Sequence, residues 1–184
     1  MTGILIKENF ISCDDVNHII DFLDNHKCAV YSPQENSTLK YGSKSLAEGL
    51  RKNEVVNNLL DKIYSIIKDD ENNYYHQYDM LLKSYPGTTL EEHYDLAQED
   101  HTHPGVDQKS KRMVKTFVVY LNEDYKGGEF YIKDKLTYKP SKGSLVMFDG
   151  DIYLHGANMV KEKSRYILVS SYVSKNIRAP YKGG

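Results

Sequence analysis

The chain has 184 residues, of which 40% are hydrophobic, and this suits one soluble domain with its own core. Its 24 basic and 26 acidic residues give a net charge of −2, which favours neither a nucleic-acid partner nor an acidic membrane. The apolar run near the N-terminus is too short for a signal peptide or a membrane span. Cys13 and Cys28 lack the spacing of a metal or redox motif, which is typical of free thiols in a reducing compartment. We therefore expect a cytoplasmic protein.

The N-terminal part of the chain is predicted to be mainly helical. Residues 3–11 alternate imperfectly between apolar and polar and predict an opening strand. Ser12 can cap the helix that apolar residues at helical spacing predict over about 14–27. The polar stretch 31–44 predicts a loop, and a second apolar stripe predicts a helix over about 53–68. Both helices are expected to support the fold.

From residue 74 onward β-favouring residues replace the helical spacing. The predicted strands cover residues 74–85, 90–95, 113–122, 129–132, 136–138, 144–149, 151–156 and 164–174. Strand 113–122 has an apolar side with Phe117 and Leu121, which would pack beneath the helices, and a mixed side with Thr116 and Tyr120, which could line a pocket. Two helices followed by about eight short strands predict an α+β domain whose strands close into a sandwich or barrel.

A candidate metal site begins at His93 and Asp95. These residues are two apart, so on an extended strand both side chains leave the same face, with Cα atoms roughly 6.6 Å apart. Alone, such a pair is more often a hydrogen-bonded surface pair than a metal site. His155, at the end of a predicted extended segment, is the natural third ligand, and two histidines with one carboxylate are typical of non-haem Fe(II) oxygenases. Arg165 begins the last strand and could bind a carboxylate in the same cavity.

The polar stretch 96–110 offers an alternative third ligand. His101 and His103 have ligand spacing and could replace His155. A long loop that contains Pro104-Gly105 is a poor platform for a preorganised ligand, so His155 is favoured. The two loop histidines are then expected to be solvated or to contact substrate.

A series of short motifs runs through the second half of the chain. They are Tyr85-x-Gly87, His93-Tyr94-Asp95, Tyr120-Leu121-Asn122, Gly127-Gly128-Glu129-Phe130, Lys142-Gly143, His155 and Arg165. Their order resembles the 2-oxoglutarate/Fe(II)-dependent dioxygenases of the prolyl 4-hydroxylase-like branch over about residues 80–173. The resemblance implies a double-stranded β-helix, a cupin-like jelly-roll with N-terminal supporting helices. It would form one domain over residues 1–184, with helical support in 1–73, the jelly-roll core in 74–174 and a tail in 175–184.

The resemblance also implies a role for each motif residue. Fe(II) would be bound by the catalytic residues His93, Asp95 and His155. The cosubstrate 2-oxoglutarate would be bound by Arg165, Tyr120, Tyr85 and Thr116. O₂ would be the oxidant, with ascorbate as an accessory reductant.

Three positions bear on the place of this chain within the branch. Arg165 stands where collagen-type prolyl hydroxylases usually carry Lys and oxygen-sensing ones carry Arg. Leu90 stands where the family commonly has Tyr, three residues before the first histidine, and cannot make that polar contact. The substrate-facing Arg of several relatives falls near Met113, which makes Arg112 a candidate substrate contact.

Three functions follow from this reading. The first is hydroxylation of an unactivated C–H bond, on a prolyl residue of a peptide or protein, with release of succinate and CO₂. The second is the same chemistry on a free amino acid, a small metabolite or a nucleic acid base. The third is a non-catalytic jelly-roll binding module. The complete ligand set with Arg165 disfavours the third, and the near-neutral charge disfavours nucleic acid. The sequence does not predict the oligomeric state.

Overall fold

The computed structural model describes residues 3–26, 30–31, 39–40, 43–70, 73–96 and 112–177. Cys28, the loop histidines His101 and His103, and residues 178–184 of the predicted tail lie outside the described residues. The helices are α1 (Cys13–Asn25), η1 (Leu50–Lys52), a 3-10 helix, and α2 (Glu54–Tyr64). The strands are β1 (Leu5–Lys7), β2 (Val30–Tyr31), β3 (Leu39–Lys40), β4 (Ser43–Leu46), β5 (Tyr74–Ser84), β6 (Thr89–His93), β7 (Arg112–Tyr120), β8 (Lys126–Gly127), β9 (Phe130–Ile132), β10 (Leu136–Tyr138), β11 (Leu145–Asp149), β12 (His155–Ala157), β13 (Val160–Glu162) and β14 (Arg165–Ile177).

Both predicted helices are present, and each begins at a polar side chain that caps it. The Ser12 hydroxyl accepts a hydrogen bond from the Asp15 N–H at 3.1 Å and starts α1. Asn53 caps α2 in the same way, and α2 ends at Tyr64, a few residues before the predicted end, because the chain continues there as turns. Within the described ranges, no helix has the length and apolar character needed to cross a membrane.

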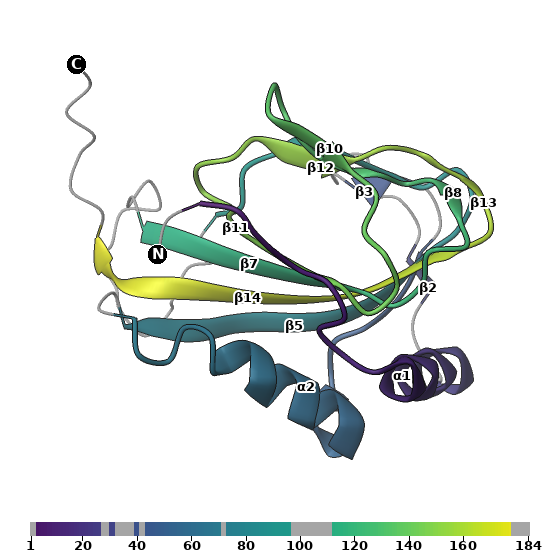
Figure 1. Cartoon of the computed structure of the whole chain (residues 1–184), viewed down its shortest axis with the longest axis horizontal. Helices are drawn as coiled ribbons and strands as arrows, with labels where there is room; N and C mark the ends of the chain where they lie inside the picture. Colours follow the sequence, from purple (N-terminus) through teal and green to yellow (C-terminus); the bar gives the residue numbers. More distant parts are fainter. Residues whose placement is uncertain are drawn as a thin grey trace.

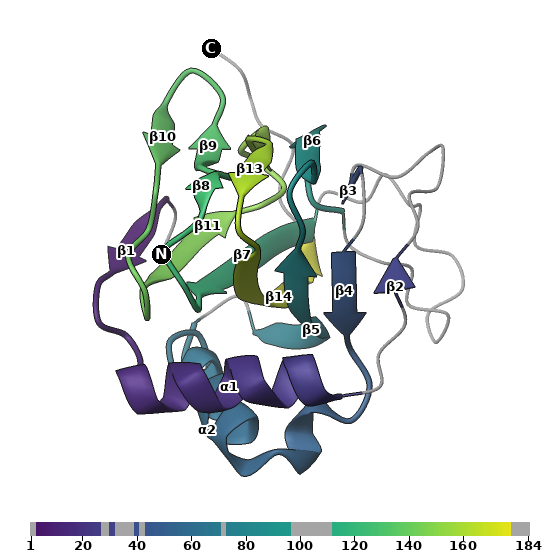
Figure 2. The same cartoon turned by 90° about the vertical axis from the view of Figure 1, so that its right-hand side faces the viewer.

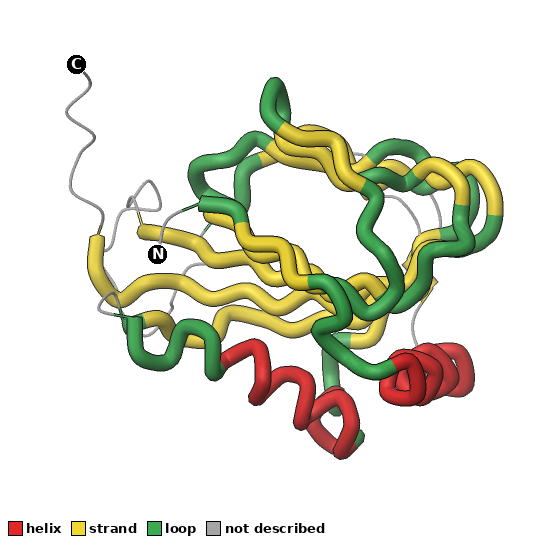
Figure 3. The backbone as a smooth tube through the Cα atoms, viewed as in Figure 1, coloured by secondary structure: helices red, strands yellow, loops and turns green. Residues whose placement is uncertain are grey.

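The strands form two antiparallel sheets that face each other (Figures 1 and 3). The larger sheet has seven strands in the order β1-β11-β7-β14-β5-β4-β2, and the smaller has five in the order β10-β9-β12-β6-β3. Strands β8 and β13 form a separate two-stranded sheet at one end. Most neighbouring strands come from distant parts of the chain, as in a jelly-roll, whereas β9 and β10 are consecutive. The predicted α+β class and double-stranded β-helix are confirmed.

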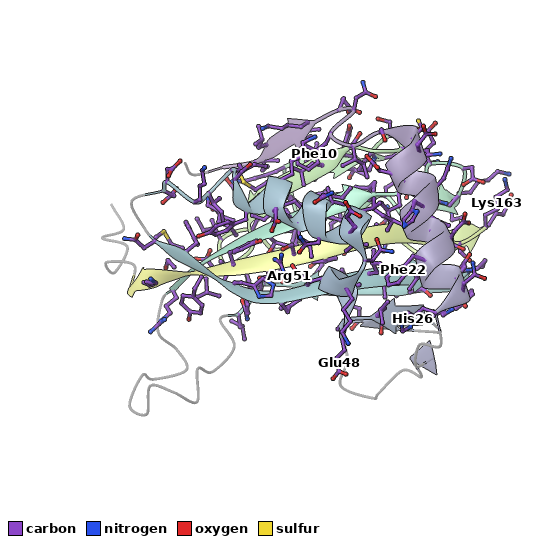
Figure 4. The ribbon with its side chains drawn as sticks, turned by 90° about the horizontal axis from the view of Figure 1, so that it is seen from below. Phe10, Phe22, His26, Glu48, Arg51 and Lys163 are labelled. Carbon is purple, nitrogen blue, oxygen red and sulfur yellow. The ribbon has the colours of Figure 1, made fainter. Side chains whose placement is uncertain are left out.

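Two apolar clusters hold the layers together. One lies between the helices and the outer face of the larger sheet, where Phe117 and Leu121 of the predicted apolar side pack against α1 and α2. Figures 2 and 4 show both helices crossing this outer face, with Phe10 near them. The second cluster lies between the sheets, where Val118 of β7 and Phe130 of β9 take part. The inner face of the larger sheet is therefore free of helices and available for a pocket.

Two sequence-based expectations are corrected. The stretch 31–44 was predicted to be a loop, yet β2, β3 and the start of β4 lie in it. These strands are only two to four residues long, too short for a clear alternation in the sequence, and their pairing with partners such as β5 and β6 defines them. His155 was predicted at the end of an extended segment but instead begins β12, after a turn over residues 150–153.

Candidate metal centre

Two histidines meet across a pair of neighbouring strands. His93 ends β6, His155 begins β12, and the two residues are direct partners in this antiparallel pair. Their ring centroids are 4.3 Å apart, and the rings are tilted by 51°. His155 is buried, with 4% of its surface exposed, and His93 is partly buried. The pairing of the strands therefore places two imidazoles side by side on the inner face of the smaller sheet.

Asp95 completes the cluster. Its Oδ1 lies 3.4 Å from Nε2 of His93, and its Oδ2 lies 3.7 Å from Nε2 of His155. One ligand atom from each of the three residues lies within 4.8 Å of the others, and no other such group of three is found in the described part of the chain. Thr116 on β7 donates its hydroxyl to Oδ2 of Asp95 at 2.5 Å. The carboxylate is thus held between the two imidazoles and the larger sheet.

The tautomer of each histidine suits metal binding. Nδ1 of His93 lies 2.8 Å from the Glu91 carbonyl, and Nδ1 of His155 lies 2.8 Å from the Tyr153 carbonyl. A carbonyl oxygen only accepts, so each Nδ1 must carry the donated proton. In its neutral form each imidazole would then have its lone pair on Nε2, the nitrogen that lies nearer Asp95, whereas a protonated Nε2 of His93 donates to that carboxylate. Backbone hydrogen bonds that orient ligand histidines in this way are usual at metal sites.

The charges in the cluster also suit a cation. Burial disfavours the carboxylate, but the hydrogen bond from His93 and the nearby His155 outweigh it, so the pKa of Asp95 is lowered. Burial lowers the pKa of His155. Burial also opposes charge on His93, but the hydrogen bond to Asp95 outweighs it and raises the pKa of that imidazole. One anionic oxygen and two imidazole nitrogens are the donor set that non-haem Fe(II) sites use.

A pocket of about 250 Å³ extends from this cluster between the two sheets. Its middle is walled by apolar side chains, among them Leu82, Val118 and Ile167. Thr116, Val118 and Tyr120 follow one another on the pocket face of β7, and because Thr116 contacts Asp95, Tyr120 and the neighbouring Arg165 line the opposite, polar end. A pocket with metal ligands at one end and a cation at the other suits an elongated ligand that has polar groups at both ends.

Arg165 has unused hydrogen-bonding capacity. Its side chain is 3% exposed, and one guanidinium nitrogen donates to the Gly128 carbonyl at 2.9 Å. Its Nε is buried and has no hydrogen-bond partner. Burial strongly raises the pKa of the neighbouring Tyr120, so this phenol stays a hydrogen-bond donor. A buried cation with a free donor beside a protonated phenol fits a bound carboxylate.

The other predicted site residues lie in three different places. Thr116 lines the pocket at its metal end and contacts Asp95. Tyr85 is not among the residues that line the pocket. Lys83 and Tyr85 are two residues apart, so their side chains point to the same face, and Nζ of Lys83 lies 5.5 Å from the Tyr85 ring centroid. Arg112 also lies outside the pocket lining, and it donates to the Tyr75 hydroxyl at 2.9 Å.

Sequence reasoning missed Tyr78, which lines the pocket near Asp95. Burial, and next the charge of Asp95, raise the pKa of Tyr78 to about 12, while a hydrogen bond with Ser171 opposes them. Tyr78 shares a face of β5 with Leu82, which was the available signal in the sequence. The irregularity in the β5–β14 pairing comes before Tyr78, so the alternation from Tyr78 to Leu82 is regular and this signal is intact.

Comparison with known proteins identifies the kind of site. A family model described as the 2OG-Fe(II) oxygenase superfamily matches residues 76–172, which contain the histidine–aspartate cluster and Arg165. The comparison with curated proteins finds no match.

Solved structures with the same fold come from several organisms. A viral collagen prolyl hydroxylase from Paramecium bursaria Chlorella virus-1, in complex with 2-oxoglutarate, has a TM-score of 0.72 and 18% identity over 94% of this chain and 97% of that chain. A prolyl-4-hydroxylase from Pseudomonas putida has a TM-score of 0.68 and 18% identity, covering 96% of this chain and 94% of its own. HygX from Streptomyces hygroscopicus, with nickel and 2-oxoglutarate bound, has a TM-score of 0.67 and 14% identity. The match covers 95% of this chain and 84% of HygX.

Proposed function

Because the chain belongs to the 2OG-Fe(II) oxygenase superfamily, whose model matches more than half of it, we propose that it hydroxylates a prolyl residue of a peptide or protein substrate. The chain is an oxygenase that uses Fe(II) and 2-oxoglutarate. The observation that carries the oxygenase chemistry of this proposal is the position of the His93–Asp95–His155 cluster and Arg165 at opposite ends of one pocket.

In this proposal His93, Asp95 and His155 hold the metal. These two histidines and one carboxylate would be the only protein ligands, the number that non-haem Fe(II) oxygenase sites use, and cosubstrate and oxygen would bind beside them. When bound, Fe(II) and 2-oxoglutarate supply the oxidising chemistry, in which O₂ gives one oxygen atom to the substrate C–H bond and one to the succinate that is released with CO₂. The histidines contribute their Nε2 lone pairs, and their Nδ1–H groups stay bonded to backbone carbonyls throughout.

Arg165 and Tyr120 bind and orient the distal carboxylate of 2-oxoglutarate. The guanidinium offers its unpaired Nε and keeps its charge at any working pH. The phenol stays protonated and donates a second hydrogen bond. Apolar residues along the middle of the pocket, such as Val118 and Ile167, exclude water between the two polar ends. The chain thereby fixes the cosubstrate at one end and leaves its other end facing the metal ligands.

The choice of a prolyl substrate rests on structural relatives. Two of the structures described above are named as prolyl hydroxylases, and a prolyl hydroxylase from Trichoplax adhaerens, in complex with a hypoxia inducible factor peptide fragment, has a TM-score of 0.65 and 17% identity. A peptide partner is therefore the first choice, and Arg112, held by Tyr75, is proposed as a contact for it.

A small-molecule substrate is the second candidate. HygX, at 14% identity, has been solved with hygromycin B bound in addition to nickel and 2-oxoglutarate. The same fold therefore accommodates hygromycin B in one relative and a peptide in another.

One experiment separates these two proposals. Purified protein is incubated with Fe(II), ascorbate and 2-oxoglutarate, together with a panel of proline-containing peptides, the same peptides with Ala in place of Pro, and a set of small metabolites. Mass spectrometry then looks for the addition of one oxygen atom. Oxygen added to Pro peptides and not to their Ala counterparts supports the first proposal. Oxygen added only to small molecules contradicts it and supports the second.

A further inference from the structure

The Asp95 carboxylate lies against the backbone of Gly150, in the turn between β11 and β12. A Cβ atom built on Gly150 would lie 2.2 Å from Oδ2 of Asp95 and 2.8 Å from both its Cβ and its Cγ. The φ angle of Gly150 is not in the left-handed region, so the backbone there would accept any residue. Glycine is needed at this position because of space alone, and the group that occupies the space is a proposed metal ligand.

Backbone hydrogen bonds fix Gly150 in this position. Its carbonyl accepts from the Asp95 N–H at 2.9 Å, and its own N–H donates to the Val114 carbonyl on β7 at 2.8 Å. The Val114 N–H in turn donates to the side chain of Asp151 at 2.9 Å. The turn is therefore attached to β7 on one side and to the backbone of the ligand residue on the other.

A buried ion pair anchors the same turn. The Lys115 ammonium and the Asp149 carboxylate are paired, with side chains that are 2% and 1% exposed. The two residues are also direct partners in the β7–β11 register, and Asp149 accepts a hydrogen bond from the Gly3 N–H at 2.9 Å. The pair thus connects the residue before Gly150 to the residue before Thr116, which itself donates to Asp95.

We propose that Gly150 and the Lys115–Asp149 ion pair are positioning residues of the metal centre, which together fix the Asp95 carboxylate between the two imidazoles. The inference rests on the proposed role of Asp95 as a metal ligand. Gly150 has no side chain and so leaves the space that the carboxylate occupies. The ion pair attaches Asp149, the residue before Gly150, to Lys115 on β7 and so fixes the position of the turn relative to that strand. Neither touches the metal, so both act through Asp95.

The first test measures Co(II) binding to the full-length metal-free chain, by titration without 2-oxoglutarate. Gly150→Ala should weaken Co(II) affinity about 10- to 100-fold, the usual effect of disturbing a group that orients a ligand. In an Asp95→Gly background, where the two histidines give a weaker baseline, Gly150→Ala should cause no further loss. The proposal would be overturned if Gly150→Ala bound Co(II) as tightly as the wild type. It would also be overturned if Gly150→Ala lowered Co(II) affinity by the same factor in the Asp95→Gly background as in the wild type.

The second test addresses the ion pair. Removing one partner would leave a buried charge unpaired, so both are replaced together, as Lys115→Met with Asp149→Leu, which can preserve the fold. We expect Co(II) affinity to fall roughly tenfold while circular dichroism shows a folded protein. The matched control is Lys163→Met with Asp124→Asn, an ion pair whose side chains are 65% and 58% exposed, and it should bind Co(II) as the wild type does. A folded Lys115→Met, Asp149→Leu variant with wild-type affinity would exclude the pair from this role.

These outcomes are distinct from a failure of the metal assignment. If Asp95→Gly itself binds Co(II) as tightly as the wild type, Asp95 is not a ligand, and both the assignment and the inference are wrong. If Asp95→Gly binds weakly while Gly150→Ala binds normally, only the inference fails.

Discussion

His155 and His93 face each other as direct partners on β12 and β6, and this single register creates the metal centre. Successive side chains on a strand point to opposite faces, so a slip of one residue would turn one imidazole away from the pocket. An irregularity follows immediately, between His155 and Ala157 in the same pairing. The pairing therefore has to be fixed by its surroundings, and β9 fixes it from the other side by pairing with all three residues of β12.

Arg165→Ala is expected to weaken 2-oxoglutarate binding. The carboxylate of the cosubstrate would then lose its buried cationic partner, which costs about 2–5 kcal/mol. The dissociation constant should rise roughly 30- to 5,000-fold, measured by calorimetry with Co(II) in place of Fe(II). Arg165→Lys, which keeps the charge, should lose less. Unchanged cosubstrate affinity in Arg165→Ala would refute the assignment.

Tyr120→Phe should have a smaller effect on the same binding equilibrium. It removes one hydrogen bond to a charged group, which is worth about 1.5–3 kcal/mol. The ring remains, so the apolar packing between the two sheets is kept. The loss of affinity should largely disappear in the Arg165→Ala background if both groups hold the same carboxylate. Equal losses in the two backgrounds would place the Tyr120 hydroxyl elsewhere.

Arg112→Ala tests the proposed peptide contact. We expect a higher KM for the peptide, with no change in 2-oxoglutarate affinity, because Arg112 lies outside the pocket lining. Tyr75→Phe removes the hydroxyl that accepts from Arg112 and should raise the peptide KM in the same direction but less. A loss of 2-oxoglutarate affinity in Arg112→Ala would show that it acts on the cosubstrate site.

Asp24 should contribute stability that depends on pH. Burial opposes ionisation of this carboxyl, but hydrogen bonds from Lys83 and Tyr166 outweigh it and lower its pKa below the ordinary 3.8. A lowered pKa means that the contribution is present above pH 3.8 and is lost as the pH falls through the lowered value. At neutral pH, Asp24→Asn should therefore cost about 0.5–1 kcal/mol in urea unfolding, since the pair is partly exposed.

The control for Asp24 uses its partner. In a Lys83→Met background, Asp24→Asn should have less effect, because the 2.8 Å ion pair is already absent. A destabilisation that stays constant from neutral to acidic pH would contradict the assigned cause.

The sequence predicted the parts of this molecule that local chemistry determines. Apolar spacing and the Ser12 cap were enough to predict α1, and strand alternation correctly assigned Phe117 to the helix side and Tyr120 to the pocket side of β7. The α+β class followed from two helices followed by short strands, and the double-stranded β-helix from the motif resemblance. The position of Asp95 next to both histidines is as the spacing suggested.

The parts that the sequence did not reveal depend on contacts between distant segments. The strands β2 and β3 are two residues long and exist only through pairing with β4 and β6. The need for glycine at position 150 arises from Asp95, which is far away in the chain.

Succinate release from 2-oxoglutarate is the most direct test of the central claim, that His93, Asp95 and His155 form the iron site of this oxygenase. Wild-type protein and His93→Ala are incubated with Fe(II), O₂ and 2-oxoglutarate, and succinate is quantified, with folding of the variant checked by circular dichroism. We predict release by the wild type and none above background by folded His93→Ala. Undiminished release by His93→Ala would contradict the account.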